Sequence, residues 1–286
     1  MPPLAYLIMR FARRFTPASV MQWMLSRNVG VKAGLETRDA AAAVGRYHEA
    51  LQGVSRSWDG ARVLILGYGG HFGLAVKLLE QGAAHVILLD PYATLKHQAN
   101  LALTQTAGEF LCVQKGEAVP NPQFITLAHD SLEAYAASDP SPLDLVLSWS
   151  VYEHLPDPEG VTRQLARLTS PHGAHVHFID LRDHYFRHPF EMLCYRESIW
   201  QRFLNPPSNL NRLRAWDYQS IFAACFHQVE VRIVERDLES FERTQSRIRP
   251  EFICGDLSQD AAVRICVCAH QPERLGASAR SLPAWG

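Results

Sequence analysis

The stretch Val63-Leu64-Ile65-Leu66-Gly67-Tyr68-Gly69-Gly70-His71-Phe72-Gly73 decides the predicted fold. It begins with a continuous apolar run, which is typical of a buried strand. It ends in glycines, which allow a tight turn and the close approach of a ligand to the backbone. Residues 74–81 then show helical spacing, and the free N–H groups at the start of such a helix can receive a polar ligand. The stretch therefore predicts a strand, a glycine-rich loop and a helix that together bind a nucleotide-like group.

Further apolar runs extend this unit into a sheet. Four of them follow in the chain, at residues 85–90, 124–127, 143–149 and 175–180, with helical patterns between them. Strands that are apolar on both faces and separated by helices indicate a parallel sheet that is covered on both sides. Two late runs, 229–234 and 263–269, have only a long, partly polar connection between them, which suits an antiparallel finish. The prediction is a doubly wound α/β fold with a seven-stranded, mostly parallel sheet whose last strand is antiparallel.

The balance of charges argues against a nucleic-acid partner. The 286 residues include 28 Lys and Arg against 29 Asp and Glu, and the formal net charge of −1 provides no general attraction for a phosphate backbone. No apolar run approaches the ~20 residues that a membrane-spanning helix needs. The six cysteines form no C-x-x-C pair and no regular framework, which fits a reduced, cytoplasmic compartment.

The N-terminal 35 residues are basic and contain no acid. Residues 4–15 place apolar side chains at helical spacing beside Arg10, Arg13 and Arg14. We expect this helix to pack its apolar face on the main domain and to leave its arginines in water. The alternative is weak contact of residues 4–15 with an anionic membrane surface. A second helix is expected to begin at Thr16-Pro17, and a third to span residues 40–51.

Asp90 adds the second half of a nucleoside site. It stands at the tip of the second apolar run, where a carboxylate can accept hydrogen bonds from both hydroxyls of an adenosine ribose. The glycine loop reads G-x-G-x-x-x-G, and Phe72 replaces the third glycine of the dinucleotide fingerprint. Because a pyrophosphate would lose its close approach to the backbone, the loop disfavours a nicotinamide oxidoreductase and favours a ligand without phosphate.

These residues carry a family resemblance. Residues 62–270 resemble a class I S-adenosylmethionine-dependent methyltransferase domain, above all through 144–158, where Glu153-His154-Leu155 follows the fourth strand. The segment 179–184, Ile-Asp-Leu-Arg-Asp-His, resembles an uncharacterised branch of that family. With the helical N-terminus, this divides the chain into a helical cap at 1–57, an S-adenosylmethionine-binding methyltransferase domain at 58–275 and a flexible tail at 276–286.

The resemblance implies cofactor-binding residues at the matching positions. They are Gly67 and Gly69 under the methionine part of S-adenosylmethionine, Asp90 at the ribose, Asp130 at the adenine amino group, and Ser148 and Trp149 beside the transferring methyl. Tyr68, His71, Pro91 and Ser131 are expected to complete the cofactor site, with His71 standing where a further glycine is common in the family. Family members often carry an acid two residues before the first glycine, where this chain has Ile65. That departure leaves open an alternative, a non-catalytic cofactor-binding or partner-regulating module that retains the fold.

Ionisable residues gather after the fourth and fifth strands, at the edge where open α/β sheets bind ligands. They are Glu153 and His154 after the fourth strand, and Asp180, Arg182, Asp183 and His184 after the fifth. A hydroxyl acceptor needs a base, and we expect His184 to take its proton, oriented by Asp180 or Asp183. His154 is the second choice as base, and Arg182 would bind an anionic acceptor group. The alternatives are a salt-bridged loop, or a divalent metal held by these carboxylates with His184 or Glu153, and of these we predict no metal.

Residues 185–218 form the longest irregular insertion, rich in aromatic residues and arginines. Its place after the fifth strand would put it over the acceptor, with Tyr185, Arg212 and Arg214 as binding residues. Ordinary packing of a helical cap explains the aromatic residues equally well. Two further pairs are expected to serve the core: His175 and His177 as hydrogen-bonded core or lining residues, and Cys266 and Cys268 as core thiols.

The sequence thus predicts methyl transfer from S-adenosylmethionine to a small-molecule or glycan-like acceptor, at oxygen in preference to nitrogen. It specifies neither the acceptor nor the oligomeric state.

Overall fold

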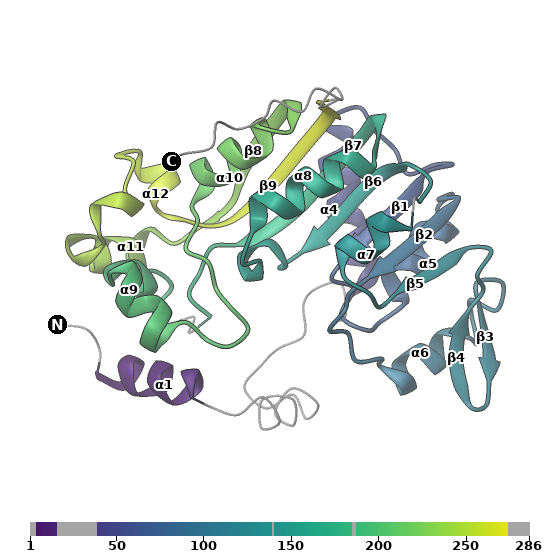
Figure 1. The fold of residues 1–286 in the computed structure, drawn as a ribbon, viewed down its shortest axis with the longest axis horizontal. Helices are drawn as coiled ribbons and strands as arrows, with labels where there is room; N and C mark the ends of the chain where they lie inside the picture. Colours follow the sequence, from purple (N-terminus) through teal and green to yellow (C-terminus); the bar gives the residue numbers. More distant parts are fainter. Residues whose placement is uncertain (1–3, 16–38, 139, 185–186, 274–286) are drawn as a thin grey trace, which may run out of the picture.

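The computed structural model describes residues 4–15, 39–138, 140–184 and 187–273, which build a central sheet with helices on both faces (Figure 1). The seven strands lie in the order β5-β2-β1-β6-β7-β9-β8. Their bounds are β1 Arg62–Leu66, β2 His85–Leu89, β5 Ile125–Ala128, β6 Leu143–Trp149, β7 Thr169–Asp180, β8 Phe226–Arg236 and β9 Ala262–Pro272. Neighbouring strands from β5 to β7 are parallel, and β9 runs antiparallel to both β7 and β8. The predicted mostly parallel sheet with an antiparallel last strand is confirmed.

Apolar residues on both faces of the strands explain the doubly wound arrangement. In β1, Ile65 points into one apolar cluster and Leu64 into the other, and both side chains are fully buried. Three helices cover the first cluster: α4 (Ala40–Gln52), α5 (Gly73–Glu80) and α6 (His97–Leu103). The other cluster is covered by α7 (Leu132–Ala137), α8 (Pro158–Leu168) and α10 (Ala215–Ala223). The third predicted N-terminal helix is therefore α4, which belongs to the cover of the sheet.

The structure adds a β-hairpin that the apolar runs do not predict. β3 (Leu111–Gln114) pairs antiparallel with β4 (Glu117–Pro120), and the hairpin extends outward beyond α6 (Figure 1). The turn residues Lys115 and Gly116 both have positive φ, 51° and 82°, as a tight two-residue hairpin turn requires. The strands are short and mostly exposed, so they leave no apolar run in the sequence.

The predicted insertion after β7 is largely a set of short helices with an apolar cluster of their own, here called the cap cluster. The helices are η2 (Glu191–Cys194), α9 (Glu197–Ile199) and η3 (Trp200–Leu204), joined by α11 (Leu238–Thr244), η4 (Gln245–Arg247), η5 (Pro250–Phe252) and α12 (Leu257–Asp260) from between β8 and β9. The cap cluster consists of Phe190, Met192, Leu193, Trp200, Leu204, Leu210, Phe241, Ile248, Ala261 and Val263. Phe190, Tyr195 and Trp200 of the insertion therefore serve packing, which is one of the two readings that the sequence left open.

Helix α1 (Leu4–Arg14) lies beside the cap and turns its polar side inward (Figure 1). Tyr6 and Arg10 are fully buried, whereas Leu4 and Ile8 are 72% and 60% exposed. The expectation that the arginines of this helix face water is wrong for Arg10, because a buried carboxylate, Asp183, pairs with it. Within the described residues, no helix is long and apolar enough to cross a membrane. The helix expected at Thr16-Pro17 and the tail 276–286 lie outside the described residues.

Candidate functional site

The glycine loop after β1 adopts backbone conformations that require glycine. Gly67, Gly69 and Gly70 have φ values of 77°, 63° and 79°, in the left-handed region that side chains disfavour. A Cβ on Gly67 would lie 2.4 Å from Cγ2 of Val151, in the segment after β6, and one on Gly70 would lie 2.0 Å from the carbonyl oxygen of Thr94. The loop is thus pressed between the ends of β6 and β2, where the sequence predicted the cofactor.

Asn100, which the sequence analysis missed, fixes the shape of this loop. Its side-chain oxygen accepts a hydrogen bond from the Phe72 amide at 3.0 Å, and its side-chain nitrogen donates to the Gly70 carbonyl at 2.9 Å. Its side chain is 1% exposed. In the sequence, Asn100 is only one polar residue on the side of α6 that becomes buried. That pattern alone does not identify a residue that shapes the loop.

The carboxylate of Asp90 lies against the loop. It accepts a hydrogen bond from the Gly69 amide at 3.1 Å and another from the Tyr92 amide at 3.0 Å. Backbone hydrogen bonds join the ends of three strands here, from Gly67 N to Leu89 O at 2.8 Å and from Asp90 N to Ala128 O at 3.1 Å. The structure therefore brings the glycine loop and Asp90 together, at the carboxyl ends of β1, β2 and β5.

The residues that follow β2 and β5 lie at the same edge. Pro91 and Asp130 are exposed, so both are accessible from solvent. Ser131 caps α7, and its hydroxyl accepts a hydrogen bond from the Ala134 amide at 3.3 Å. The Ser131 side chain therefore has a structural task, and the expected contact of Asp130 with the adenine stays a prediction.

Two buried polar groups of the loop lack a hydrogen-bond partner among the described residues. They are the hydroxyl of Tyr68 and Nδ1 of His71. Burial, with the negative charge of Asp90 as a smaller cause, raises the pKa of Tyr68 to about 12, and burial also lowers the pKa of His71. Buried polar groups almost always have partners in folded proteins, so these two atoms fit a loop that receives a polar ligand.

Ser148 and Trp149, at the end of β6, point to opposite faces of the sheet. The Ser148 side chain is fully buried and bonds Nδ1 of His177 at 2.7 Å. Its hydroxyl therefore points into the core. The predicted contact of Ser148 with the cofactor would have to come from its backbone atoms. Trp149 stacks on Phe178 with ring centroids 4.3 Å apart and is 9% exposed. Its ring therefore packs in the core, and only a small part of it is accessible to solvent.

Asp180 and Arg182 bind each other. Arg182 donates to both carboxylate oxygens, from Nε at 2.9 Å and from Nη2 at 2.6 Å, and its Nη1 lies 3.6 Å from Glu235. This pair disfavours the prediction that Arg182 binds an anionic acceptor, because its guanidinium is neutralised by two carboxylates. The Asp180 oxygens bind Arg182, and the Asp180 charge also acts on His184, so its expected role in orienting that histidine stays a prediction.

Asp183 belongs to the contact between α1 and the rest of the chain. Its side chain is fully buried and receives hydrogen bonds from the Tyr6 hydroxyl at 2.5 Å and from the guanidinium of Arg10. The ring of Trp200 lies 4.9 Å from the Arg10 guanidinium carbon. Asp183 thus anchors α1, which supplies these two donors, and its expected role in orienting a catalytic histidine stays a prediction.

Arg212 and Arg214 are structural arginines. Arg212 donates to the carbonyls of Met192 and Tyr195 at 2.9 and 2.6 Å and pairs with Glu197. Arg214 is fully buried and donates to the carbonyls of Asp260 and Ala262 at 3.0 and 2.8 Å. Arg212 thus ties parts of the cap to one another, and Arg214 ties the cap to the start of β9. These contacts occupy both guanidinium groups, and their expected role in acceptor binding stays a prediction. Tyr185, the third residue of that prediction, lies outside the described residues.

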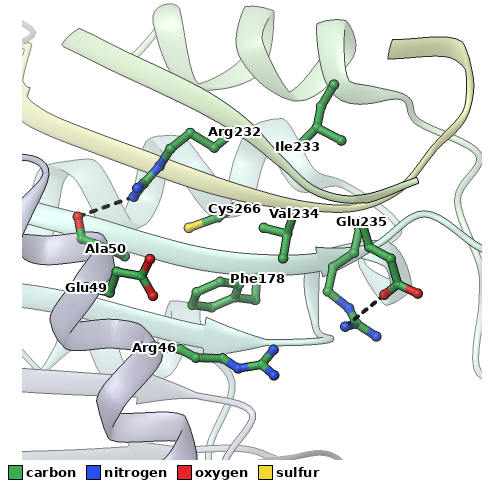
Figure 2. A pocket seen from close by; sticks show the side chains of 10 residues that line it. Arg46, Glu49, Ala50, Phe178, Arg232, Ile233, Val234, Glu235 and Cys266 are labelled. Carbon is green, nitrogen blue, oxygen red and sulfur yellow. Dashed lines mark hydrogen bonds and ion pairs between the residues drawn. The ribbon is translucent and has the colours of Figure 1, made fainter. Parts of the chain in front are cut away.

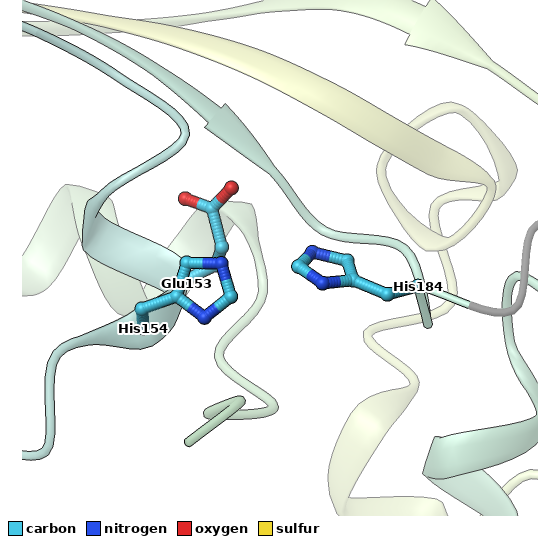
Figure 3. Close-up of side chains that lie close together, drawn as sticks. All are labelled: Glu153, His154 and His184. Atoms are coloured by element: carbon cyan, nitrogen blue, oxygen red, sulfur yellow. The ribbon is translucent and has the colours of Figure 1, made fainter. Parts of the chain in front are cut away.

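Glu153, His154 and His184 come together after β6 and β7 (Figure 3). One ligand-type atom of each lies within 4.8 Å of those of the other two, and the two imidazole rings are 4.8 Å apart. Burial lowers the pKa of His154, and burial with the neighbouring His154 lowers that of His184 to about 3. Both rings are therefore neutral near pH 7. The predicted choice between His184 and His154 becomes a pair of adjacent imidazoles.

His175 and His177 form part of a buried relay on β7. Thr169 donates its hydroxyl to the Leu165 carbonyl at 2.7 Å, so it accepts from Nε2 of His175 at 2.8 Å. Nδ1 of His175 then accepts from Nε2 of His177 at 3.3 Å. The last hydrogen bond of this relay is donated by the Ser148 hydroxyl to Nδ1 of His177. One direction of donation satisfies every member with both rings neutral, and the expectation of hydrogen-bonded core histidines is confirmed.

All six cysteines are free thiols, and Cys266 and Cys268 are buried core residues as predicted. They adjoin or line a cavity of about 460 Å³ between α4 and the strands β7, β8 and β9 (Figure 2). Arg232 donates to the Ala50 carbonyl there at 3.3 Å, and Arg264 pairs with Glu235 at 3.0 Å. None of the residues that line this cavity belongs to the predicted cofactor or catalytic sets.

Comparison with known proteins identifies the family. Residues 40–237 match the model of a family described as a methyltransferase domain. The chain belongs to this family and so to the class I S-adenosylmethionine-dependent methyltransferases. The cofactor implied by the resemblance is therefore the cofactor of the family.

Curated relatives include ubiquinone biosynthesis O-methyltransferases. The protein of Klebsiella pneumoniae (strain 342) is 32% identical over 115 residues, which are 38% of this chain and 46% of the relative. The protein of Cronobacter sakazakii (strain ATCC BAA-894) is 32% identical over 123 residues, 41% of this chain and 49% of the relative. The chain thus spans about half the length of the curated relatives that it matches.

Solved structures of similar proteins include a putative sarcosine dimethylglycine methyltransferase from Galdieria sulphuraria. It is 16% identical, with a TM-score of 0.45 over 81% of this chain and 84% of that chain. A putative S-adenosylmethionine-dependent methyltransferase from Listeria monocytogenes is 14% identical, with a TM-score of 0.44 over 81% of this chain and all of that chain (100%).

Proposed function

We propose that this chain transfers a methyl group from S-adenosylmethionine to a hydroxyl of a small-molecule acceptor. The observation that carries the proposal is the contact between the Asp90 carboxylate and the Gly69 amide. It joins the glycine loop to the acid of the second strand at the edge where an adenosyl group would lie. The curated relatives are O-methyltransferases, which supports oxygen as the methylated atom.

The residues of the loop and of the neighbouring strand ends would hold the cofactor. The backbone of Gly67 to Gly70 lies close to the methionine part, Asp90 accepts the ribose hydroxyls, and Asp130 reaches the adenine amino group. The unpartnered Tyr68 hydroxyl provides a further polar contact from beneath the loop. Bound S-adenosylmethionine supplies a methyl on a sulfonium: the O–C bond forms as the S–C bond breaks, and the electron pair of the broken bond leaves on sulfur.

The acceptor would lie over the ends of β6 and β7. A hydroxyl must lose its proton as the O–C bond forms, and Glu153, His154 and His184 are the ionisable groups that gather at this point. The loop from Asn205 to Asn211 lies across the same place, because the Asn211 amide donates to the Glu153 carbonyl at 2.8 Å. The cap can therefore enclose an acceptor and exclude water while the chain aligns it with the methyl group.

Calorimetry with S-adenosylhomocysteine tests the cofactor site. We expect Asp90→Ala to weaken binding at least about tenfold, since hydrogen bonds to a charged group contribute about 1.5–3 kcal/mol. Gly70→Ala should also weaken it, because the new Cβ would meet the Thr94 carbonyl. The matched control is Gly116→Ala in the β3–β4 turn, where φ is also positive and nothing lies within 4 Å of the new Cβ. Unchanged affinity in Asp90→Ala would refute this cofactor site.

A screen of hydroxylated acceptors with a labelled methyl donor tests the activity itself. Transfer to a hydroxyl, lost in Asp90→Ala and kept in Gly116→Ala, is the expected result. Binding of S-adenosylhomocysteine without turnover on any acceptor pool would instead indicate the non-catalytic module that Ile65 left open.

A further inference from the structure

The carboxylate of Glu153 is buried without a hydrogen-bond partner among the described residues. Its side chain is 1% exposed, and neither oxygen has a donor there. A carboxyl group removed from water takes up a proton, or needs a cation or several donors to compensate for its lost hydration. Burial and, secondarily, the nearby Asp180 carboxylate raise the pKa of Glu153 well above its ordinary value, and a bound cation would return the group to its ionised form. His154 and His184 are the potential metal ligands beside it (Figure 3). We propose that Glu153, His154 and His184 bind a divalent metal ion at the carboxyl ends of β6 and β7.

The spacing of the three side chains fits one ion. Ligand atoms about 2.0–2.2 Å from a tetrahedral metal ion lie about 3.3–3.6 Å from one another, and the three atoms here lie within 4.8 Å. Side-chain movements of about 1–1.5 Å would bring them onto a common centre. The three ligands come from two segments that neighbouring strands hold, so the site is formed by the fold itself.

His154 has the outer hydrogen bond that metal-binding histidines show. Its Nδ1 donates to the Asn209 carbonyl at 2.8 Å, which leaves the lone pair on Nε2 available for a metal. Asn209 is fixed in turn, because its side chain donates to the His154 carbonyl at 3.1 Å and accepts from Asn205 at 2.8 Å. This arrangement orients the ring before any ion binds. It also gives the loop from Asn205 to Asn211 a function.

The ligand set indicates which metals fit. Two neutral imidazoles with one carboxylate suit Zn²⁺ and the other first-row divalent ions, whereas Mg²⁺ and Ca²⁺ prefer sites made of oxygen. Three protein ligands leave positions open for an acceptor hydroxyl. An ion there lowers the pKa of the bound hydroxyl, and its proton passes to solvent. This role rests on the proposed methyl transfer, and it replaces the general base that we predicted from the sequence.

Metal binding by the whole chain tests the proposal. Protein stripped with a chelator and titrated with Zn²⁺ in a calorimeter should bind one equivalent at a dissociation constant below about 1 μM. Glu153→Gln and His184→Ala should each weaken binding at least about tenfold. The matched control is the exposed His48→Ala, which should bind like the unmodified chain. Circular dichroism checks that each variant is folded. If one variant is unfolded, the comparison rests on the other.

The outcomes separate this proposal from the proposed function. No heat with Zn²⁺ or Mn²⁺, or equal affinity in a folded variant, overturns the metal site. If S-adenosylhomocysteine still binds to that metal-free protein, the proposed function stands without the metal. If neither the cofactor product nor a metal binds, both fail.

A second observation, independent of this one, concerns α1. Every exposed residue from Leu4 to Phe15 is apolar, because the buried side of the helix carries Tyr6 and Arg10. Ile8, Phe11 and Phe15 are 60%, 52% and 59% exposed, and Phe11 and Phe15 touch with ring centroids 4.7 Å apart. A surface helix of a soluble domain normally turns its apolar side to the core and its polar side to water, and α1 does the opposite. Large exposed apolar patches mark interaction sites.

We propose that this face of α1 rests on an anionic lipid surface. Residues 1–35 contain no acid, and Arg14, next to the exposed Phe15 in the sequence, is only partly buried, whereas the charge of Arg13 acts on His154 and His184. Apolar side chains that enter the headgroup region beside arginines are the pattern of an interfacial helix. The buried contacts of Arg10 and Tyr6 with Asp183 would hold the sheet and the cap at that surface.

Vesicle sedimentation of the full chain tests this proposal. We expect binding to vesicles with phosphatidylglycerol, weaker binding to pure phosphatidylcholine, and at least about a tenfold loss in Ile8→Ser with Phe11→Ser. The control is Val113→Ser, an apolar residue 55% exposed on β3. Absence of binding to anionic vesicles at low salt overturns the proposal. So does a dimer in analytical ultracentrifugation that becomes monomeric in the double variant, since the face would then bind a second copy.

Discussion

Asn100 shows how one side chain can set the geometry of a ligand loop. It bridges Phe72 N–H and Gly70 C=O, and the Lys96 amide also donates to that carbonyl at 3.0 Å. In Asn100→Leu, the carbonyl keeps the Lys96 amide while the Phe72 amide loses its partner. An orphaned buried donor costs about 1–3 kcal/mol. We expect a lower free energy of unfolding by that amount, measured by urea denaturation.

The same variant should weaken S-adenosylhomocysteine about tenfold or more in calorimetry, because the loop loses its fixed shape. Asn121→Ala provides the control, since this partly exposed asparagine bonds the Glu109 carbonyl at 3.2 Å away from the loop. If Asn100→Leu binds the ligand as the unmodified chain does, the loop keeps its shape through its glycines alone.

At the residue scale, sequence reasoning located positions better than roles. The glycine loop and Asp90 were predicted and lie together, because short-range chain geometry dictates a strand, a turn and a helix. The acceptor contacts expected of Arg182, Arg212 and Arg214 stay predictions that the structure does not favour, because each guanidinium already binds a nearer partner in the fold. For Arg214 these partners are backbone carbonyls near residue 260, and no spacing in the sequence reveals them.

At the scale of elements, α1 is joined to the cap by a buried ion pair. Arg10→Met would leave the buried Asp183 carboxylate without its cation while the Tyr6 hydroxyl still donates to it, and breaking such a pair costs about 3–5 kcal/mol. We expect α1 to detach locally, so that its amides lose protection in hydrogen exchange while the sheet keeps its own. The control is Arg243→Met, which breaks an exposed pair with Glu239 and should cost less than about 1 kcal/mol.

Replacing both members of the pair makes the prediction sharper. Arg10→Met with Asp183→Leu removes both charges, and apolar replacements of a buried pair are often neutral. Protection of α1 should therefore return toward that of the unmodified chain. Equal loss of protection in the single and double variants would show that the charges do not couple the helix to the cap.

The strands and α1 explain which elements a sequence can reveal. The inner strands, buried on both faces, leave continuous apolar runs, and the edge strand β8 was found from its alternating apolar residues at 229–234. The β3–β4 hairpin is exposed and leaves no such run. The orientation of α1 was reversed because its partner, Asp183, lies 177 residues from Tyr6 along the chain. Periodicity assigns the apolar face to the core, and only a distant buried charge can override it.

At the scale of the whole molecule, the buried relay of His175 and His177 makes stability depend on pH. Burial lowers the pKa of His175 to about 3 and that of His177 well below its ordinary value. In the unfolded chain both rings titrate near 6.5. Between pH 6.5 and 3 the unfolded state therefore binds more protons than the folded state, so the free energy of unfolding falls as the pH falls.

Each histidine should contribute about 1.4 kcal/mol per pH unit below about pH 6. Urea unfolding at pH 7, 6 and 5 measures this slope, and His175→Gln should reduce it by about one histidine's share while leaving a side chain that can still bond Thr169. His48→Gln is the matched control, because the His48 side chain is exposed. A His175→Gln slope equal to that of the unmodified chain would mean that the ring accepts a proton inside the fold. The relay could then reverse its direction of donation, and the neutral arrangement that joins β6 to β7 would not be the one that stabilises the sheet.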